Sequence, residues 1–204
     1  MDLLLTLCSL APFYLLGSFP SGLLIAKRSG IDLTSQGSGN IGATNVLRVL
    51  GKRAGALTLF GDILKGFLAV VLANLISAKP GYFCLCGVAA VCGHCISLPL
   101  TVGGIRLKGG KGVATAFGVL LFIEPISAVC GLLIFGVLLT LFQIVSLASV
   151  SASLLIPICA LLLDIQSEKV LSMIVISLIV VYCHKDNLSR LVRGEEKKIS
   201  ANRS

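Results

Sequence analysis

The chain has 204 residues, of which 56% are hydrophobic and 13% are charged, and its formal net charge is +8. Soluble domains carry about a quarter of charged residues, so this composition excludes an ordinary soluble protein and predicts an integral membrane protein. The polar stretches are too short for a separate soluble domain. We therefore expect one membrane domain over residues 1–204 with a short tail at 184–204.

The first apolar run, residues 3–26, lacks the basic start of a signal peptide, since Asp2 precedes it. Pro12, Gly17 and Pro20 interrupt the run, which predicts a kinked spanning helix. Six more apolar segments follow, so we expect an all-α integral membrane protein with seven transmembrane helices. The six segments are 54–77, 82–100, 112–123, 126–142, 146–163 and 169–183.

Basic residues are unevenly distributed between the two sides that seven spans define. The loop before residue 54, the loop before residue 112 and the tail hold most of them, whereas Lys79 and Lys169 fall on the other side. The positive-inside rule then predicts an N-terminus outside and a C-terminus in the cytoplasm. Four polar clusters, distant in sequence, would all reach the cytoplasmic face.

The first cluster is a glycine-rich loop between the first two spans. Glycine reaches positive φ values, so successive N–H groups can turn toward one anion. Its spacing with Asp62 also spells a dinucleotide fingerprint, but that motif needs a βαβ unit, and a plain flexible loop is the simpler alternative. We expect a phosphate site made by Gly37, Ser38, Gly39, Asn40, Gly42, Thr44, Asn45 and Arg48.

The second cluster is the turn Gly109-Gly110-Lys111-Gly112, which enters an apolar segment. A glycine-rich turn before a helix favours anion binding, and Lys111 would add a point charge. The turn is not a Walker A loop, because Gly112 stands where that motif has Ser or Thr. A cytoplasmic loop whose lysines only set topology is the alternative.

The third and fourth clusters lie at the start of the sixth span and after the seventh. Ser146 and Ser149 either donate to a ligand or bond to their own helix. His184 and Asn187 are three residues apart and share a helix face. The histidine would carry a proton or orient a substrate, unless the tail only lies on lipid headgroups.

Other chemistry-bearing residues fall within apolar segments. Asp62 and Lys65 in the second span either neutralise each other or form the floor of a site. The eight cysteines lie mostly in apolar runs and are typical of buried thiols. Cys92 and Cys95 flank His94, but a redox dithiol needs a thioredoxin-type fold. The spacing to the preceding cysteines is poor for zinc, so we expect no metal site.

Together the four clusters resemble the bacterial acyl-phosphate:glycerol-3-phosphate acyltransferases, the PlsY family, over essentially the whole chain. The resemblance implies a seven-helix enzyme of the bacterial inner membrane with its active site facing the cytoplasm. Such an enzyme moves a fatty acyl group from acyl phosphate to the 1-hydroxyl of glycerol 3-phosphate, giving lysophosphatidic acid and phosphate. It implies no cofactor, no nucleic acid, and a separate enzyme that supplies acyl phosphate.

The resemblance also implies roles for individual residues. Glu195 matches a glutamate tied to structural integrity, and Gly109 and Gly110 join the phosphate-binding loop. The residues implied to be catalytic are Ser38, Arg48, Lys111, Ser149, His184 and Asn187. Two stretches depart from the family pattern: the connection from His94 to Lys111 is longer, and Gln143-Ile144 replaces basic and aromatic residues.

Two other functions compete with acyl transfer. A transporter of phosphorylated solutes usually has repeated halves and a site at the membrane midplane, and this sequence shows no repeat. A non-catalytic lipid-binding subunit would leave four anion-binding clusters without a purpose. Acyl phosphate is already activated and no Ser-His-Asp arrangement is evident, so we expect direct transfer without an acyl-enzyme. Acyl-chain preference, proton acceptor, binding order and oligomeric state stay open.

Overall fold

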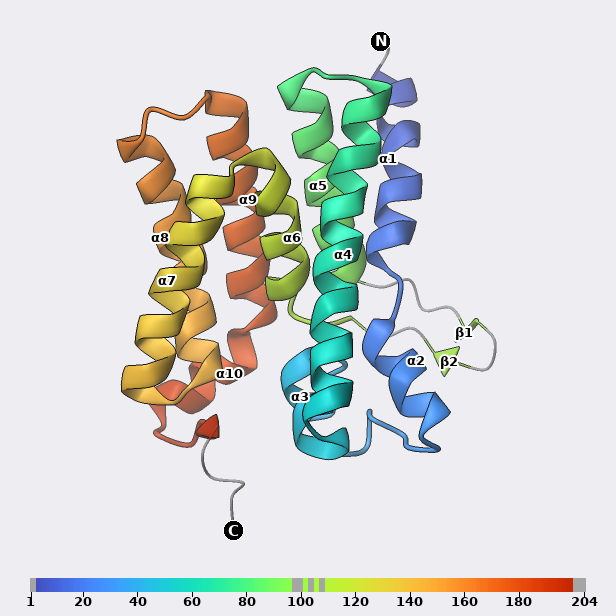
Figure 1. Cartoon of the computed structure of the whole chain (residues 1–204), viewed down its shortest axis with the longest axis vertical. Coiled ribbons are helices and arrows are strands. Elements are labelled where there is room, and N and C mark those ends of the chain that lie inside the picture. The colour runs from blue at the N-terminus through green and yellow to red at the C-terminus, as the bar shows by residue number, and fades with distance from the viewer. Residues whose placement is uncertain (1–2, 97–100, 103–104, 107–108, 200–204) are drawn as a thin grey trace.

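The computed structural model describes residues 3–96, 101–102, 105–106 and 109–199. These residues form a helical bundle with one small two-stranded ladder (Figure 1). The strands are β1 (Thr101–Val102) and β2 (Ile105–Arg106), paired antiparallel. The helices are α1 (Leu3–Gly17), α2 (Ser21–Arg28), α3 (Ala43–Leu50), α4 (Lys52–Ile76), α5 (Pro80–Cys95), α6 (Val113–Ile123), α7 (Pro125–Phe142), α8 (Val145–Leu162), α9 (Ser167–Cys183) and α10 (Lys185–Val192).

Each of the seven predicted apolar segments contains a helix, and the all-helical membrane class is confirmed. Residues 8–28, α4, α7 and α8 are long and apolar enough to cross a membrane. The pair α9 and α10 adds a fifth crossing if it counts as one span bent by 61°, and α5 and α6 are shorter apolar helices. The seven crossings and their orientation therefore stay predictions.

The first predicted segment is two helices instead of one kinked helix. Pro20 stands at the junction, and its missing N–H interrupts the helical hydrogen bonds. Lys65 Nζ satisfies the freed Phe19 carbonyl at 2.8 Å, and Ser18 Oγ fastens the end of α1 to α5 by donating to the Gly93 carbonyl at 3.0 Å. A break inside an apolar bundle is tolerated where such partners exist.

Close backbone contacts hold the helices together. A Cβ atom placed on Gly66 of α4 would lie 2.1 Å from the Thr115 carbonyl oxygen of α6, and one on Gly118 of α6 would lie 2.0 Å from the Ile63 carbonyl oxygen. Gly17 of α1 approaches α5 in the same way. Small residues at these crossings allow the tight helix packing by which membrane helices associate.

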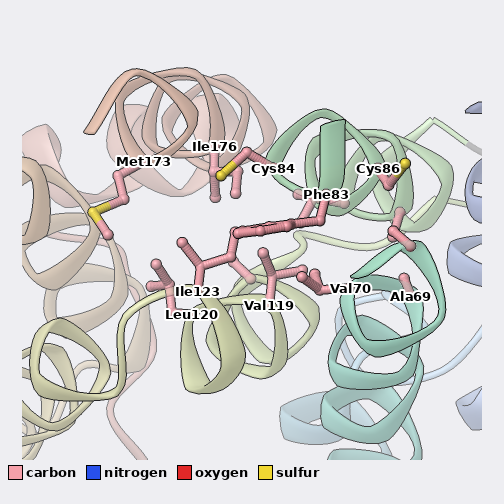
Figure 2. Close-up of a cluster of buried hydrophobic side chains, with 14 of the residues drawn as sticks. Ala69, Val70, Phe83, Cys84, Cys86, Val119, Leu120, Ile123, Met173 and Ile176 are labelled. Carbon is pink, nitrogen blue, oxygen red and sulfur yellow. The ribbon is translucent and has the colours of Figure 1, made fainter. Parts of the chain in front are cut away.

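The main apolar core lies where α4, α5, α6 and α9 meet (Figure 2). Val70, Phe83, Val119 and Met173 are each at most 7% exposed. By contrast, long apolar side chains such as Leu162 point outward with most of their surface exposed. An apolar exterior around an apolar core is the pattern expected of a bundle surrounded by lipid.

Three short helices lie at one end of the bundle, and of these α3 was not predicted, because a loop was expected there. Helices α2, α3 and α10 gather there, opposite the start of α1 (Figure 1). The β1–β2 ladder, also not predicted, follows α5, which ends at Cys95. The end of the predicted segment 82–100 lies outside the described residues from position 97 on. This end of the bundle carries the polar clusters.

Candidate active site

The glycine-rich loop is shaped by two backbone positions and one buried amide. Gly37 and Gly39 have φ values of +62° and +66°, which favour glycine. The Asn45 Oδ1 atom accepts a hydrogen bond from the Ser38 N–H at 2.8 Å. A Cβ atom on Gly37 would lie 2.2 Å from that same Oδ1 atom, so this position needs glycine for space as well as for conformation.

Both amide hydrogens of the Asn45 side chain are donated to carbonyl groups within the loop. Its Nδ2 atom donates to the carbonyl oxygens of Gln36 at 3.1 Å and Asn40 at 2.8 Å. Its side chain is buried, with 2% of the residue exposed. The sequence predicted that Asn45 donates to a phosphate. In this structure Asn45 instead ties the loop together, because both donor hydrogens already have acceptors.

The polar segment 37–48 is part loop and part helix, whereas the sequence predicted a loop. Gly42 caps the N-terminus of α3, and the Asn40 Oδ1 atom accepts from the Gly42 N–H at 2.9 Å. Thr44 and Arg48 are therefore four residues apart on one helix and share a face. The helix gives Arg48 a fixed direction that a loop would not.

Lys111 follows the turn at the entrance to α6. Gly112 caps that helix with a φ of +78°, and the Gly110 N–H donates to the His94 carbonyl at 2.9 Å. The pKa of Lys111 is lowered to about 8, chiefly by burial; the charge of Glu196 opposes this shift, and the charges of Arg190 and Arg48 add to it. Lys111 is therefore still mostly charged at neutral pH.

His184 occupies the break between α9 and α10. Its Nδ1 atom lies 2.7 Å from the Val180 carbonyl oxygen, which only accepts, so Nδ1 carries the hydrogen and Nε2 has the lone pair. Burial lowers the pKa of His184 to about 4, the bond to Val180 opposes this, and the charge of Lys111 adds to it. The imidazole is neutral near pH 7.

Glu196 joins two of the predicted clusters. Its Oε1 atom accepts from Ser146 Oγ at 2.8 Å and Asn187 Nδ2 at 2.5 Å, and its Oε2 atom accepts from Arg190 Nε at 2.7 Å. Burial alone would raise the pKa of Glu196, but these hydrogen bonds and the Arg190 charge outweigh it and lower the pKa. The carboxylate thus fixes α10 against the start of α8.

The sequence placed this structural role one residue earlier, on Glu195. Glu195 pairs with Arg193 at 2.9 Å, and more than half of each side chain is exposed. Two adjacent glutamates follow Gly194, and nothing in their order distinguishes the buried one. Arg190 on α10 indicates that an acidic partner lies nearby, but it does not distinguish Glu195 from Glu196.

The four predicted clusters come together around Lys111. The charges that act on Lys111 are those of Glu196, Arg190, Arg48 and Asp186, which belong to α3, to α10 and to the segment that follows α10. Ser146 joins them through Glu196. Ser149 is buried one turn further along α8, on the same side as Ser146. Cations and neutral donors thus gather at one end of an apolar bundle.

The eight cysteines are free thiols, including Cys92 and Cys95. Within the described part of the chain, no group of three His, Cys, Asp or Glu residues is arranged to hold a metal ion. Asp62 and Lys65 form a buried ion pair, with 2.9 Å between Lys65 Nζ and Asp62 Oδ1. This pair lies in α4, apart from the Glu196 network of α8 and α10.

Comparison with known proteins identifies the group to which this arrangement belongs. The family model described as glycerol-3-phosphate acyltransferase matches residues 7–194. The chain belongs to the glycerol-3-phosphate acyltransferase family. A member from Geotalea daltonii is 44% identical, with the alignment covering 90% of this chain and 92% of that protein. A member from Trichlorobacter lovleyi is 41% identical, over 94% and 96% of the two chains.

Solved structures of the family share the fold. The glycerol 3-phosphate form of PlsY (YgiH), an integral membrane glycerol 3-phosphate acyltransferase, is 36% identical with a TM-score of 0.85. Its lysophosphatidic acid form has a TM-score of 0.83, and each comparison covers 95% of this chain and 94% of the other. The resemblance to PlsY inferred from the sequence is confirmed, and the chain is an integral-membrane acyltransferase.

Proposed function

We propose that this acyltransferase moves a fatty acyl group from acyl phosphate to the 1-hydroxyl of glycerol 3-phosphate, releasing phosphate and lysophosphatidic acid. The observation that carries the proposal is the set of charges around Lys111, which come from Arg48 on α3, from α10 and from the segment that follows α10. Both substrates bear phosphate, and cations with fixed N–H donors suit two phosphates. The acyl chain stays among the apolar helices or in the surrounding lipid.

We assign the residue roles from the family resemblance, supported by the charges that surround Lys111. Arg48 and Lys111 neutralise the phosphates, and the backbone of the loop with Ser38, Asn40 and Thr44 donates hydrogen bonds. Gly109 and Gly110 let the backbone of the turn approach a phosphate closely. Ser149 on α8, and His184 and Asn187 at the start of α10, would contact the substrates from the other side of Lys111. No cofactor or metal takes part in the proposed reaction.

The acyl group passes directly between the two oxygens. The glycerol hydroxyl attacks the acyl carbonyl, the carbonyl–phosphate bond breaks, and phosphate leaves with its electron pair. The site supplies proximity and charge stabilisation, so no protein nucleophile is required. With its low pKa, His184 is a weak base, whereas a phosphate dianion is a stronger one, since its conjugate monoanion has a pKa of about 6. The hydroxyl proton therefore goes to a substrate phosphate, and His184 Nε2 accepts a hydrogen bond from the neighbouring glycerol hydroxyl and so orients the substrate.

The proposed topology has seven crossings, with the N-terminus outside and the active site in the cytoplasm of a bacterial cell. The start of α1 and the polar end with α10 lie at opposite ends of the bundle, which supports an odd number of crossings (Figure 1). Substrate made in the cytoplasm would then reach the site directly. The enzyme that supplies acyl phosphate is the expected functional partner.

The experiment that tests this function supplies purified protein with glycerol 3-phosphate and one of two donors. We expect lysophosphatidic acid and one equivalent of inorganic phosphate from acyl phosphate, and no product from acyl-CoA. Product from acyl-CoA alone would overturn the proposed donor. Absence of product from either donor would overturn acyl transfer itself. A stable acyl-protein adduct, trapped without glycerol 3-phosphate, would overturn direct transfer.

A further inference from the structure

A buried charged pair in α4 is not used by the proposed reaction. The side chains of Asp62 and Lys65 are each 4% exposed, and 2.9 Å separates Lys65 Nζ from Asp62 Oδ1. Removing two charges from water is costly, so a buried ion pair is by itself weak evidence that the pair stabilises the protein. Its further contacts indicate what it does.

The first further contact reaches the break between α1 and α2, where Lys65 Nζ donates to the Phe19 carbonyl. The second reaches α5, where His94 Nδ1 lies 3.7 Å from Asp62 Oδ1. That distance is longer than a hydrogen bond, and His94 Nδ1 has no hydrogen-bond partner among the described residues. The carboxylate still attracts the N–H dipole of the ring and orients it.

The other edge of the imidazole lies against the turn that precedes Lys111. A Cβ atom on Gly110 would lie 2.2 Å from His94 Nε2, so the ring contacts the backbone there. The Gly110 N–H also donates to the His94 carbonyl. Gly109 packs equally tightly, since its Cβ would lie 1.8 Å from the Cys95 carbonyl oxygen. The end of α5 is therefore the surface on which the turn rests.

Two consecutive glycines cannot hold a turn by themselves, because each has wide conformational freedom. Lys111 follows them on a flexible four-carbon stem. A misplacement of about 1 Å at a reacting group is enough to cost roughly a hundredfold in rate. A rigid support beneath Gly110 therefore matters for the position of the Lys111 ammonium.

We propose that His94 is a positioning residue for Lys111. Its imidazole is oriented by the Asp62–Lys65 pair and packs against the backbone of the Gly109–Gly110 turn. This contact fixes the position of the turn relative to α5, and therefore the position of the Lys111 ammonium that would bind a phosphate. The inference rests on the proposed function. It differs from a redox or zinc role for the Cys92–Cys95 pair around His94, because the ring faces Asp62 and Gly110.

Two substitutions of His94 distinguish a specific contact with Gly110 from a general effect of lost side-chain packing. In His94→Asn the amide reaches only the place of Nδ1, whereas in His94→Gln it reaches the place of Nε2 and renews the contact with Gly110. Cys86→Ala, a buried change elsewhere in α5, is the control for lost stability. Each variant is assayed with glycerol 3-phosphate and acyl phosphate from pH 6 to 10, together with its melting temperature.

We expect His94→Asn to raise KM for glycerol 3-phosphate at least tenfold. We also expect the decline of kcat/KM at alkaline pH to occur at higher pH, because Lys111 becomes more exposed to water and its pKa rises. The KM of His94→Gln should stay within threefold of that of the unchanged protein. Cys86→Ala should change neither KM nor the pH at which kcat/KM declines. The proposal is overturned if His94→Asn leaves both unchanged, or if all three variants show the same loss.

A second readout does not depend on catalysis. The rate of Lys111 acetylation by acetic anhydride, followed by peptide mass spectrometry across pH, reports when its amine loses its proton. A higher midpoint in His94→Asn supports the proposal, and an unchanged midpoint overturns it. Inactivity of the unchanged protein would overturn only the proposed function. If His94→Asn does not fold, Gly110→Ala displaces the ring instead and should give the same shift.

Discussion

Lys111 occupies an unusual electrostatic position for a lysine. Burial and two nearby arginines disfavour its charge, while Glu196 favours it, and the balance leaves its pKa at about 8. A cation that is partly desolvated and not fully neutralised binds a phosphate strongly, because little water has to be removed first. Arg48, on α3, adds a second and permanent charge.

Removal of either cation should abolish most of the activity. For Lys111→Ala and Arg48→Ala we expect kcat/KM to fall by roughly a hundredfold to a thousandfold, the range for a lost charge-stabilising group. Steady-state assay with glycerol 3-phosphate and acyl phosphate measures it. Lys52→Ala removes an exposed cation at the start of α4 and serves as the control. Activity within threefold in Lys111→Ala would contradict the assigned role.

The pH dependence of the reaction should follow Lys111. Its ammonium is present below pH 8 and is lost as the pH rises through that value, so attraction for phosphate weakens on the alkaline side. We expect kcat/KM for glycerol 3-phosphate, which reports the free enzyme, to decline with a midpoint near pH 8. The Lys111→Arg variant should lose this decline, because arginine stays charged. A flat profile to pH 10 in the unchanged protein would argue against Lys111.

At the scale of elements, short helices and loops position the chemistry. Helix α3 gives Arg48 its direction, and α10 is fastened to α8 through Glu196. The tail was expected to be a short cytoplasmic extension, but its first part is a helix that packs on the bundle. The site is thus assembled from segments that are individually too short to be stable helices in water.

The two adjacent glutamates offer a matched test of this fastening. The Glu196→Gln variant loses the negative charge that strengthens the hydrogen bonds from Ser146, Asn187 and Arg190. We therefore expect this variant to have a free energy of unfolding lower by about 2–4 kcal/mol. Glu195→Gln should change it by less than about 1 kcal/mol, because its ion pair is exposed. Thermal or denaturant unfolding in detergent compares them. A larger loss in Glu195→Gln would restore the role predicted from the sequence.

The glycine-rich loop permits a second matched test. Gly37 and Gly30 both have positive φ, so alanine strains the backbone at both positions. A Cβ atom on Gly37 would collide with Asn45 Oδ1, whereas one on Gly30 meets no atom within 4 Å. We expect Gly37→Ala to raise KM for glycerol 3-phosphate at least tenfold and Gly30→Ala to leave it unchanged. Equal KM values in the two variants would contradict the loop as a phosphate site.

At the scale of the whole molecule, glycine contacts set the distances between helices, and those distances determine where the site forms. Helices α4 and α6 approach closely at Gly66 and Gly118. Through this crossing, the turn before α6 is held next to α4 and α5. Among the described residues, the exposed long apolar side chains lie outside the proposed site, which agrees with a bundle immersed in lipid.

The predicted orientation can be tested with single cysteines. In a variant whose eight cysteines are replaced, Lys52→Cys should be protected from a membrane-impermeant maleimide in intact cells, and Lys79→Cys should react. Both lysines are exposed and lie at opposite ends of α4. The reverse pattern would overturn the predicted topology. We also expect the cysteine-free variant to keep its activity, since the thiols have no role in the proposed reaction.

The sequence by itself determined the membrane class, the positions of seven apolar helical segments and the family. Hydrophobic runs are local, and the polar motifs are made of neighbouring residues, so both can be read without knowledge of the fold. It also named Arg48 and Lys111 as the two cations of the site, but it did not name Glu196. The tertiary structure decided which of two glutamates is buried, and it gave Asn45 an internal role. These assignments depend on partners distant in sequence, because burial and hydrogen bonds are set only once the helices pack.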